Sequence, residues 1–323
     1  MLKDLEKAPS TLIVLAAPSL LNEYYKDHFK DIIKFQKDLV EKVITQTSDQ
    51  ILIFADEPTF EKCAKDFPPQ IMRKFNFSDI WIRDFSPPVE DLHFKYSTSY
   101  ENDILAPVSW LSFANKTKLS FQRVDYMLDG GNVVHNGKDK LIVSRRFLED
   151  NKITSLEEGI KILKSLFKTF HHFAIIPYDD PVLGHADGMV SFIEEDVLLM
   201  IKFDENKLLR KVRKILNKSF EGIKIIEIET IYSGQKYKGV FSAEGCYVNI
   251  LTTNEALYVP IFEMKFDETV LKVIQENTKK KVVPINCKKV SILGGTVRCL
   301  TWEVKGKNAE NILNWKEDDD WHD

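Results

Sequence analysis

Residues 12–55 of the chain are LIVLAAPSLLNEYYKDHFKDIIKFQKDLVEKVITQTSDQILIFA. The segment begins with a short apolar run, Leu12 to Ala17, and ends with a second one, Gln50 to Ala55. Short runs of this kind, rich in β-branched residues and bounded by chain-breaking residues, predict buried strands. Between them, Leu21 to Val43 places its large apolar residues mostly three and four positions apart, which predicts a helix with one buried face. The segment therefore predicts a strand–helix–strand unit.

The same alternation continues along the chain and predicts an α/β fold. Further buried strands are predicted at Phe173 to Pro177, Lys224 to Ile228 and Val282 to Ile285. Further helices are predicted at Ser155 to Phe170, Asp204 to Phe220 and Asp267 to Asn277. Ser155 and Glu158 have the spacing of a capping box, and an Asp is the expected cap of each of the other two helices. The rhythm recurs roughly every 60 residues, which suggests about five related units around an axis.

The length and composition are those of an ordinary globular protein. The chain has 323 residues, of which 44% are hydrophobic and 29% charged, and this excludes a disordered or fibrous protein. No linker rich in Pro, Gly or Ser divides it, so we expect a single domain over residues 1–323. Lys and Arg total 45 against 49 Asp and Glu, and the resulting net charge of −4 argues against nucleic acid as a partner.

No segment has the pattern of a membrane span or a secretory signal. The longest apolar run, Leu12 to Leu21, is about ten residues long and contains Pro18, whereas a membrane-spanning helix needs roughly 20 residues. The N-terminus lacks the basic start, apolar stretch and cleavage site of a signal peptide. We therefore expect a cytoplasmic protein without a membrane partner. The cysteines include no CxxC pair and fit neither a disulfide framework nor a zinc site: Cys63, Cys246, Cys287 and Cys299.

The 13 glycines are unevenly placed. Six of them lie in three short segments: Asp129-Gly130-Gly131-Asn132, Gly184-His185-Ala186-Asp187-Gly188, and Gly294-Gly295 shortly before Cys299. Because glycine permits positive φ and close backbone approach, such clusters often mark turns at which a ligand meets the main chain. Each segment alone also has a plainer interpretation, as a hairpin turn at Asp129, a hydrogen-bonded loop at His185 or a buried thiol at Cys299. Asp84 alone equally fits an ion pair with Arg83 or a turn cap.

Taken in order, these segments resemble the motifs of guanidino-group-modifying enzymes, in particular agmatine deiminases and bacterial peptidylarginine deiminases. The matching segments are Trp81-Ile82-Arg83-Asp84-Phe85-Ser86-Pro87 for W-x-R-D-x-G-P, Asp129-Gly130-Gly131-Asn132 for [DE]-G-G-[NS], Gly184-His185-Ala186-Asp187 for G-H-x-D, Tyr247-Val248-Asn249 for Y-V-N, and Gly294 to Thr301 for G-G-x-x-x-C-x-T. The resemblance spans about residues 80 to 305. This chain departs from the pattern at Ser86, where Gly is usual, at Arg298, where many agmatine deiminases have His, and in having two glycines rather than three before Cys299.

The resemblance implies a fold and a way of bringing distant residues together. The family's fold is a five-bladed α/β propeller (pentein) of ββαβ units around a pseudo-fivefold axis, with the active site on that axis. This agrees with the fivefold rhythm of the sequence. If each unit sends a residue or two to one axial cavity, side chains about 50 residues apart can face a single substrate.

The proposed chemistry explains why each residue type is needed. A guanidinium is a delocalised cation, and carboxylates bind its planar N–H groups in bidentate pairs, a role that the motifs assign to Asp84 and Asp187. Asp129 is a candidate third acid, for orientation or for the pocket wall. Cys299 is the expected nucleophile as a thiolate, and His185 is expected to protonate the departing ammonia and then activate water.

Two further residues are candidates for substrate binding, and the remaining cysteines and histidines are not. Trp81 either stacks on the cation or belongs to the core, and Asn249, on a predicted inner strand, is a candidate to face the substrate. Cys63, Cys246 and Cys287 are interpreted as structural. The other histidines have no metal-ligand spacing, so no metal and no cofactor are expected.

The resemblance implies an enzyme that hydrolyses agmatine to N-carbamoylputrescine and ammonia through an S-linked amidino intermediate on Cys299, a step of putrescine and polyamine biosynthesis. Peptidyl or free arginine is the alternative substrate with the same mechanism, and its carboxylate would need a cationic partner in the pocket. Two other classes are an inactive propeller used as a binding scaffold and a metal-dependent amidohydrolase built on His185 and Asp187. The expected partner is a small guanidino molecule, and a homo-oligomer is left open.

Overall fold

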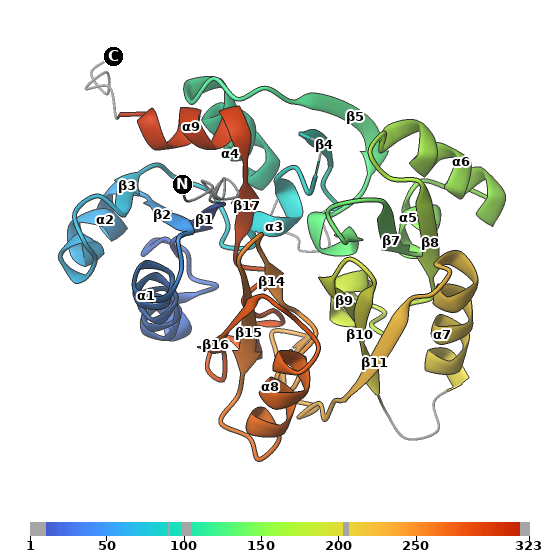
Figure 1. Ribbon diagram of the computed structural model, residues 1–323. Helices are drawn as coiled ribbons and strands as arrows, with labels where there is room; N and C mark the ends of the chain where they lie inside the picture. The colour runs from blue at the N-terminus through green and yellow to red at the C-terminus, as the bar shows by residue number, and fades with distance from the viewer. Residues whose placement is uncertain (1–10, 90, 98–104, 203–206, 317–323) are drawn as a thin grey trace, which may run out of the picture.

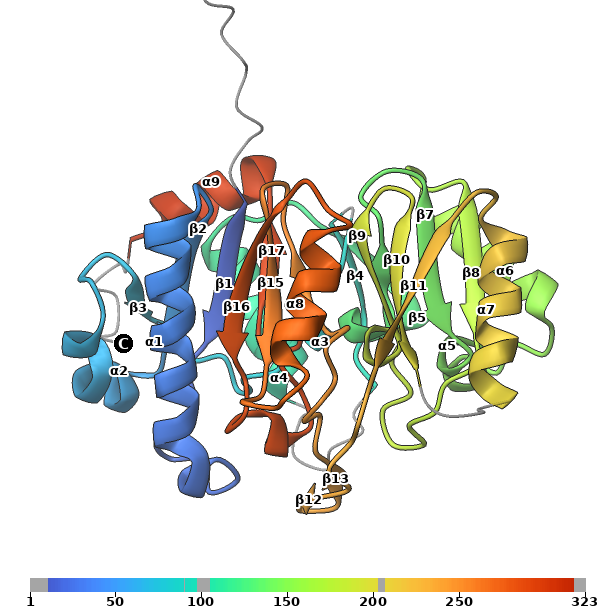
Figure 2. The same cartoon turned by 60° about the horizontal axis from the view of Figure 1, so that its bottom comes forward.

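Five small sheets surround a common axis, and helices cover their outer sides (Figure 1). The structure, a computed structural model, describes residues 11–89, 91–97, 105–202 and 207–316. The described residues also form a separate two-stranded hairpin, which projects from one end of the ring of sheets (Figure 2). The predicted α/β class and the implied five-bladed propeller are confirmed.

Three of the sheets share one construction. In each, an antiparallel pair of strands is followed by one or two outer helices and a third strand, which lies parallel to the second. Two neighbouring parallel strands need a long crossover connection, and in these sheets the outer helices supply it. The first of these sheets contains β6 (Val134–His135), β7 (Lys140–Ser144) and β8 (His172–Ile176), with helices α5 (Arg146–Asp150) and α6 (Leu156–Leu166). The second contains β9 (Val190–Glu194), β10 (Val197–Lys202) and β11 (Lys224–Glu229), with α7 (Lys207–Ser219). The third contains β14 (Leu251–Thr252), β15 (Ala256–Ile261) and β16 (Lys281–Asn286), with α8 (Asp267–Gln275).

The other two sheets vary this plan. Strands β4 (Leu92–Lys95) and β5 (Gln122–Met127) form a parallel pair joined through α4 (Leu105–Lys116). The last sheet has the order β17-β1-β2-β3 and contains both the first and the last of the described strands, because β17 pairs antiparallel with β1. Its strands are β1 (Leu12–Ala16), β2 (Gln50–Ala55), β3 (Met72–Lys74) and β17 (Trp302–Val304), and its helices are α1 (Phe29–Gln46), α2 (Glu57–Cys63) and α9 (Gly306–Asn314).

The remaining elements are short. They are η1 (Lys26–His28), η2 (Ala64–Asp66), α3 (Ile82–Phe85), η3 (Gly130–Asn132), η4 (Ala186–Gly188) and η5 (Ser291–Leu293), together with the hairpin strands β12 (Lys236–Tyr237) and β13 (Val240–Phe241). Several of these short elements and turns come shortly before a strand that lies at one edge of its sheet. The α3 turn comes before β4, η3 before β6, η4 before β9, residues 246–249 before β14, and Cys299 before β17. The sequence motifs therefore occupy equivalent places in the five sheets.

The strands predicted from the sequence are confirmed to within a few residues, but one predicted helix start and one predicted cap are wrong. The helix expected from Leu21 begins at Phe29, because the preceding residues form turns, one of them stabilised by Asn22 Oδ1, which accepts from Tyr24 N at 2.9 Å. Asp267 is not a cap but lies in the first turn of α8, where its carboxylate accepts from Phe262 N and Met264 N.

Other predicted boundaries are met or displaced slightly. The Ser155 cap is confirmed, since its hydroxyl accepts from Glu158 N at 3.1 Å. The helix that it starts ends at Leu166 rather than Phe170. The predicted cap Asp204 lies outside the described residues, and α7 is described from Lys207.

Burial explains why the inner strands are apolar on both faces. Leu12, Ile13, Val14 and Leu15 of β1 are completely buried, as expected for a strand that has neighbours in its sheet and packing on both faces. Cys63 and Cys287 are buried among apolar side chains, in keeping with a structural role. Among the described residues, no helix is both long and apolar enough to cross a membrane.

Candidate active site

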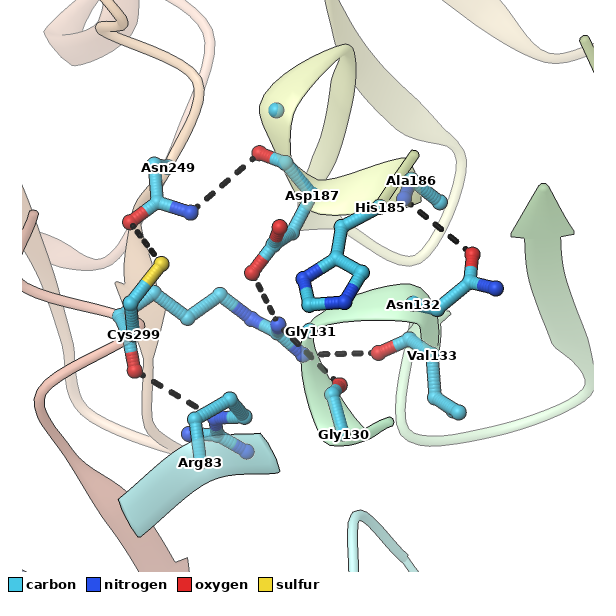
Figure 3. A network of polar contacts seen from close by, with 12 residues as sticks. Arg83, Gly130, Gly131, Asn132, Val133, His185, Ala186, Asp187, Asn249 and Cys299 are labelled. Carbon is cyan, nitrogen blue, oxygen red and sulfur yellow. Dashed lines mark hydrogen bonds and ion pairs between the residues drawn. The ribbon is translucent and has the colours of Figure 1, made fainter. Parts of the chain in front are cut away.

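The five loops that lead into the sheets are hydrogen-bonded to one another around the axis. The contacts are Gly131 N to Asp84 Oδ1 (2.8 Å), His185 Nε2 to Asp129 Oδ2 (3.1 Å), Asn249 Nδ2 to the Asp187 carbonyl (3.5 Å), Cys299 Sγ to Asn249 Oδ1 (3.4 Å) and Arg83 N to the Cys299 carbonyl (3.4 Å). Figure 3 shows several of these contacts, with Cys299, Asp187 and His185 gathered around one space. Residues more than 200 positions apart in the sequence therefore belong to one polar network.

A cavity of about 330 Å³ opens on this network. His185, Asp187, Asn249 and Cys299 line it, so four of the residues singled out in the sequence share one space. Asp84, Asp129 and Trp81 do not belong to its lining and lie behind it. The remaining lining residues come from the loop 179–188, the hairpin region 232–246 and the two glycines before Cys299.

His185 is held between two carboxylates. Its Nε2 lies 3.1 Å from Asp129 Oδ2, and its Nδ1 lies 3.8 Å from Asp84 Oδ1. The second oxygen of Asp129 accepts from Ser97 N at 2.7 Å, so both oxygens of this carboxylate are engaged by the protein. Asp129 therefore contacts the imidazole and the Ser97 amide and is not among the residues that line the cavity.

The glycines of the second motif make room for this arrangement. A Cβ at Gly131 would lie 2.5 Å from His185 Nδ1 and 2.8 Å from Asp84 Oδ1, and one at Gly130 would lie 1.9 Å from the Arg83 carbonyl oxygen. All three distances are far inside van der Waals contact, so only glycine lets these loops approach. Asn132 of the same motif accepts from Ala186 N at 3.3 Å and holds the histidine loop in register.

The ionisation of the site is governed by its three buried carboxylates. Burial disfavours a charged imidazole, but Asp84, Asp129 and Asp187 outweigh it and raise the pKa of His185 to about 10. Burial raises the pKa of Asp84 to about 7, with Asp129 and Asp187 adding to the rise and His185 opposing it. The histidine is therefore protonated near neutral pH and able to donate a proton.

The thiol of Cys299 lies in surroundings that favour its protonated form. Burial, and then Asp187 and Asp84, raise its pKa well above the usual value, while a hydrogen bond from the Thr296 backbone and the charge of Arg298 act in the opposite direction. A cation bound in the cavity would likewise lower the pKa of Cys299. The site is thus built so that the thiolate becomes accessible when a positive ligand is present.

Asp187 does not have both carboxylate oxygens free. Its Oδ2 accepts from Arg298 Nη1 at 2.7 Å, so one oxygen remains for another donor. Asn249 is also fixed by the protein, since its Oδ1 accepts from Thr296 Oγ1 at 2.7 Å as well as from Cys299. Trp81 packs behind Gly295, where an added Cβ would meet its ring at 2.5 Å, and it belongs to the main apolar cluster.

Several residues around the cavity were not identified from the sequence. Asp179, Asp180, Tyr232 and Phe241 line its wall and outer part, and they come from segments without a recognisable motif. Cys246 also lines the cavity, so its interpretation as merely structural was incomplete. Burial, followed by Asp187 and Asp179, raises the pKa of Cys246 to about 12, which keeps it a thiol.

The described part of the chain contains no group of three or more His, Cys, Asp or Glu side chains placed to hold a metal ion. Among the chemical groups that the cavity presents are the Cys299 thiol, the His185 imidazolium and a carboxylate oxygen of Asp187, and the Asp84 carboxylate lies 3.8 Å from the imidazole. Together they suit binding of a planar cation and nucleophilic attack on it.

Comparison with known proteins gives a consistent result. Residues 3–304 match the family model of Porphyromonas-type peptidyl-arginine deiminases. A curated protein of Listeria monocytogenes with a provisional agmatine deiminase name is 20% identical over 316 residues, which cover 81% of this chain and 84% of the relative. The solved structure of C. jejuni agmatine deiminase superposes with a TM-score of 0.75 at 20% identity and covers 91% of this chain and 93% of its own. DDAH from Pseudomonas aeruginosa shares the fold at a TM-score of 0.59 and 12% identity, covering 92% of this chain and 100% of its own.

Proposed function

This chain is a guanidino-modifying deiminase of the Porphyromonas-type peptidyl-arginine deiminase family, and we propose that its substrate is agmatine, which it hydrolyses to N-carbamoylputrescine and ammonia. The observation that carries the proposal is the cavity itself, in which a thiol, an imidazolium and an acidic outer wall face one space. The reaction is proposed to take place in the cytoplasm on a free small molecule.

The first step is capture of the guanidinium. We assign this to the free oxygen of Asp187 and to Asp84, which meets His185 at the back of the cavity. Each carboxylate has one oxygen engaged by the protein, Asp84 by Gly131 N and Asp187 by Arg298, so each is fixed in orientation before the substrate arrives. Such preorganisation lets binding energy place the central carbon near the sulfur of Cys299.

The second step is covalent. The Cys299 thiolate forms a bond to the central carbon, and the cationic guanidinium becomes a neutral tetrahedral adduct. His185 then gives its proton to the departing nitrogen, which leaves as ammonia, and the substrate remains attached as an S-linked amidino group. The now neutral His185 takes a proton from water as the water oxygen bonds to the amidino carbon. The carbon–sulfur bond then breaks and restores the Cys299 thiolate, and the hydroxyl proton is released as the carbonyl forms. This proton converts the ammonia already released into ammonium.

The outer part of the cavity favours an amine over a carboxylate at the far end of the substrate. Asp179 and Asp180 belong to the lining, whereas no Lys or Arg of the described residues does. Tyr232 and Phe241 add aromatic surface, which suits an aliphatic stem and a terminal ammonium group. Agmatine ends in an amine and arginine in a carboxylate, so this wall supports agmatine.

A substrate panel tests the proposal. Purified protein is given agmatine, arginine, an arginyl peptide and butylguanidine, and ammonia and the ureido product are measured. We expect kcat/KM to be highest for agmatine and turnover to be lost in Cys299→Ala, by on the order of 10⁴-fold or more, while the fold is retained. Preference for arginine or the peptide would replace agmatine by that substrate, and absence of ammonia release from the whole panel would favour a binding scaffold.

Asp179 allows the far end to be tested separately. Asp179→Asn should raise KM for agmatine by about tenfold, because a charge-assisted contact contributes about 1.5–3 kcal/mol when partly buried and less at an exposed rim. KM for butylguanidine, which lacks the amine, should stay unchanged. Glu157→Gln, an exposed carboxylate on α6 that does not line the cavity, is the matched control. Equal effects on both substrates would remove Asp179 from amine recognition.

A further inference from the structure

Arg298, the residue directly before Cys299, has a guanidinium that is buried beside the site and makes three hydrogen bonds. Its Nη1 donates to Asp187 Oδ2 at 2.7 Å and lies 3.5 Å from the Gly130 carbonyl oxygen, and its Nη2 donates to the Val133 carbonyl oxygen at 2.7 Å. Only 7% of Arg298 is exposed. The three acceptors, Asp187, Gly130 and Val133, are labelled in Figure 3. One side chain thus joins the nucleophile segment to the η3 and η4 loops.

The contact with Asp187 determines how that carboxylate can meet a ligand. With Oδ2 bound to Arg298, rotation of the carboxylate would break a charge-assisted hydrogen bond, so the other oxygen keeps a fixed direction. An unpaired Asp187 would instead be drawn toward the protonated His185, which its charge already influences. Arg298 therefore separates the carboxylate needed for binding from the imidazolium needed for proton transfer.

The charge of Arg298 also matters for the nucleophile. Asp84, Asp129 and Asp187 place three buried carboxylates around a thiol that must ionise. Against them, His185 and Arg298 are the cations in direct contact with these carboxylates in the described structure. Removing one of the two would leave a more negative site, in which a thiolate is less favourable.

Arg298 does not reach the ligand space itself. It is absent from the residues that line the cavity, and its donors are directed at Asp187 and at two main-chain oxygens behind that cavity. Its backbone is fixed from the other side, because its carbonyl oxygen accepts from Arg83 Nε at 3.4 Å. Any effect on catalysis must pass through the residues that it holds.

We propose that Arg298 is a positioning residue of the deiminase reaction, which fixes one oxygen of Asp187 toward the substrate and supplies positive charge next to Cys299. The proposal rests on the proposed function, since it needs a guanidinium ligand for Asp187 and a thiolate at Cys299. It assigns a role to the position at which this sequence departs from the histidine of many agmatine deiminases.

The test compares the full-length wild type with Arg298→Gln and Arg298→Lys. Two quantities are measured: kcat and KM on the best substrate of the panel, and the pH dependence of Cys299 alkylation by iodoacetamide, followed by peptide mass spectrometry with Cys63, which does not line the cavity, as internal reference. In Arg298→Gln we expect kcat/KM to fall about 100-fold, as for a misplaced reacting group, and the alkylation profile to move to higher pH. Arg298→Lys keeps the charge but not the planar fork, so it should restore the alkylation profile and recover kcat/KM only in part.

Arg73→Gln is the matched control for the loss of a structural arginine. The Arg73 guanidinium also donates to main-chain oxygens, those of Ile312, Leu313 and Trp315 at 2.8–2.9 Å, but it lies away from the cavity. Its loss should lower Tm and leave both kcat/KM and the alkylation profile unchanged. If Arg298→Gln behaves in this way, or if Arg298→Gln fails to fold and Arg298→Lys has wild-type kcat/KM, the positioning role is refuted.

The two proposals fail in different ways. A wild type without ammonia release on any guanidine would refute the proposed function, whatever the variants do. An active wild type whose Arg298 variants keep both its kinetics and its alkylation profile would refute only the role of Arg298.

Discussion

The proposed mechanism needs a charged imidazole at His185 and a charged sulfur at Cys299 at the same pH, whereas free histidine and cysteine side chains are mostly neutral near pH 7. The carboxylates around His185 supply the first condition, with a pKa of about 10, and work against the second by raising the pKa of Cys299. The substrate cation relieves this conflict when it binds, because it stabilises the thiolate.

The pH dependence of kcat should reflect this pair in the enzyme–substrate complex, where the substrate cation favours the thiolate. As pH rises, the thiol of Cys299 loses its proton and kcat increases; at higher pH His185, whose pKa is raised to about 10, loses its proton and kcat decreases. We therefore expect an alkaline optimum. Asp129→Asn removes an anion from His185 and so lowers the imidazole pKa, which should move the descending limb to lower pH. Initial rates with buffers from pH 6 to 11 check this, and a descending limb that stays in place would show that another group is titrating.

The sequence predicted which residues belong to the candidate site, but it did not predict which hydrogen-bond partners they have. The motifs around Asp84, His185 and Cys299 pointed to one site, because the chemistry of a guanidinium requires those types. They did not show that Asp187 shares an oxygen with Arg298, or that both oxygens of Asp129 are occupied by Ser97 and His185. Such pairings depend on the distance between loops from different sheets, which no local pattern encodes.

The short η3 turn lies against both the Asp84 carboxylate and the His185 imidazole. Gly131 lies against both His185 and Asp84, and its N–H holds the Asp84 carboxylate. A methyl group there would have to displace at least one of them, since the neighbours are themselves fixed by hydrogen bonds.

We therefore expect Gly131→Ala to reduce kcat/KM by about 100-fold with a small loss of Tm. Gly137→Ala is the control, because Gly137 has a positive φ of 73° but open space around its Cα. That substitution should lower Tm through backbone strain and leave kcat/KM intact. Both effects are measured by steady-state kinetics and thermal denaturation, and an active Gly131→Ala would mean that the η3 turn can shift without disturbing the imidazole.

Element boundaries were predictable where the signal was local. Ser155 caps α6 as its spacing with Glu158 indicated. The apolar spacing from Leu21 continued upstream of the actual start of α1, because Asn22 and its neighbours prefer turns that also bury apolar side chains. Asp267 was misread as a cap because its bonds to Phe262 N and Met264 N depend on a bend that precedes the helix.

The ring of sheets is closed by a strand from the far end of the chain. In β17, Trp302 pairs with Val14 of β1, is 3% exposed, and donates through Nε1 to the Pro87 carbonyl oxygen at 3.1 Å. Its ring also meets Trp110 of α4 edge to face. This closure lies three residues after Cys299, so the stability of the ring and the position of the nucleophile are linked.

Trp302→Ala should destabilise the whole protein by about 3–5 kcal/mol, as expected for removal of a large buried ring. Denaturant titration followed by far-UV circular dichroism measures the loss, and Trp315→Ala, at a half-buried position near the end of the described chain, is the comparison. A loss below about 1 kcal/mol for Trp302→Ala would mean that β17 contributes little to closure.

The alternation of strands and helices in the sequence predicted about five units around an axis. It did not predict that β17 pairs with β1 and closes the ring. Nothing in the three residues of β17 distinguishes them from other short apolar segments, and their pairing with β1 spans nearly the whole sequence. Long-range antiparallel pairing is decided by the assembled ring, since only there do the two edges meet.

The pairing of Leu12 with Val304 also means that the ring has no fixed starting point. A circular permutant would join the two ends by a short linker and open the chain instead at an exposed connection such as Gly222. The five units would then follow one another from a different starting point in the sequence, while each kept the same neighbours in space. A permuted gene of this kind should still encode a protein with all five loops meeting at the axis.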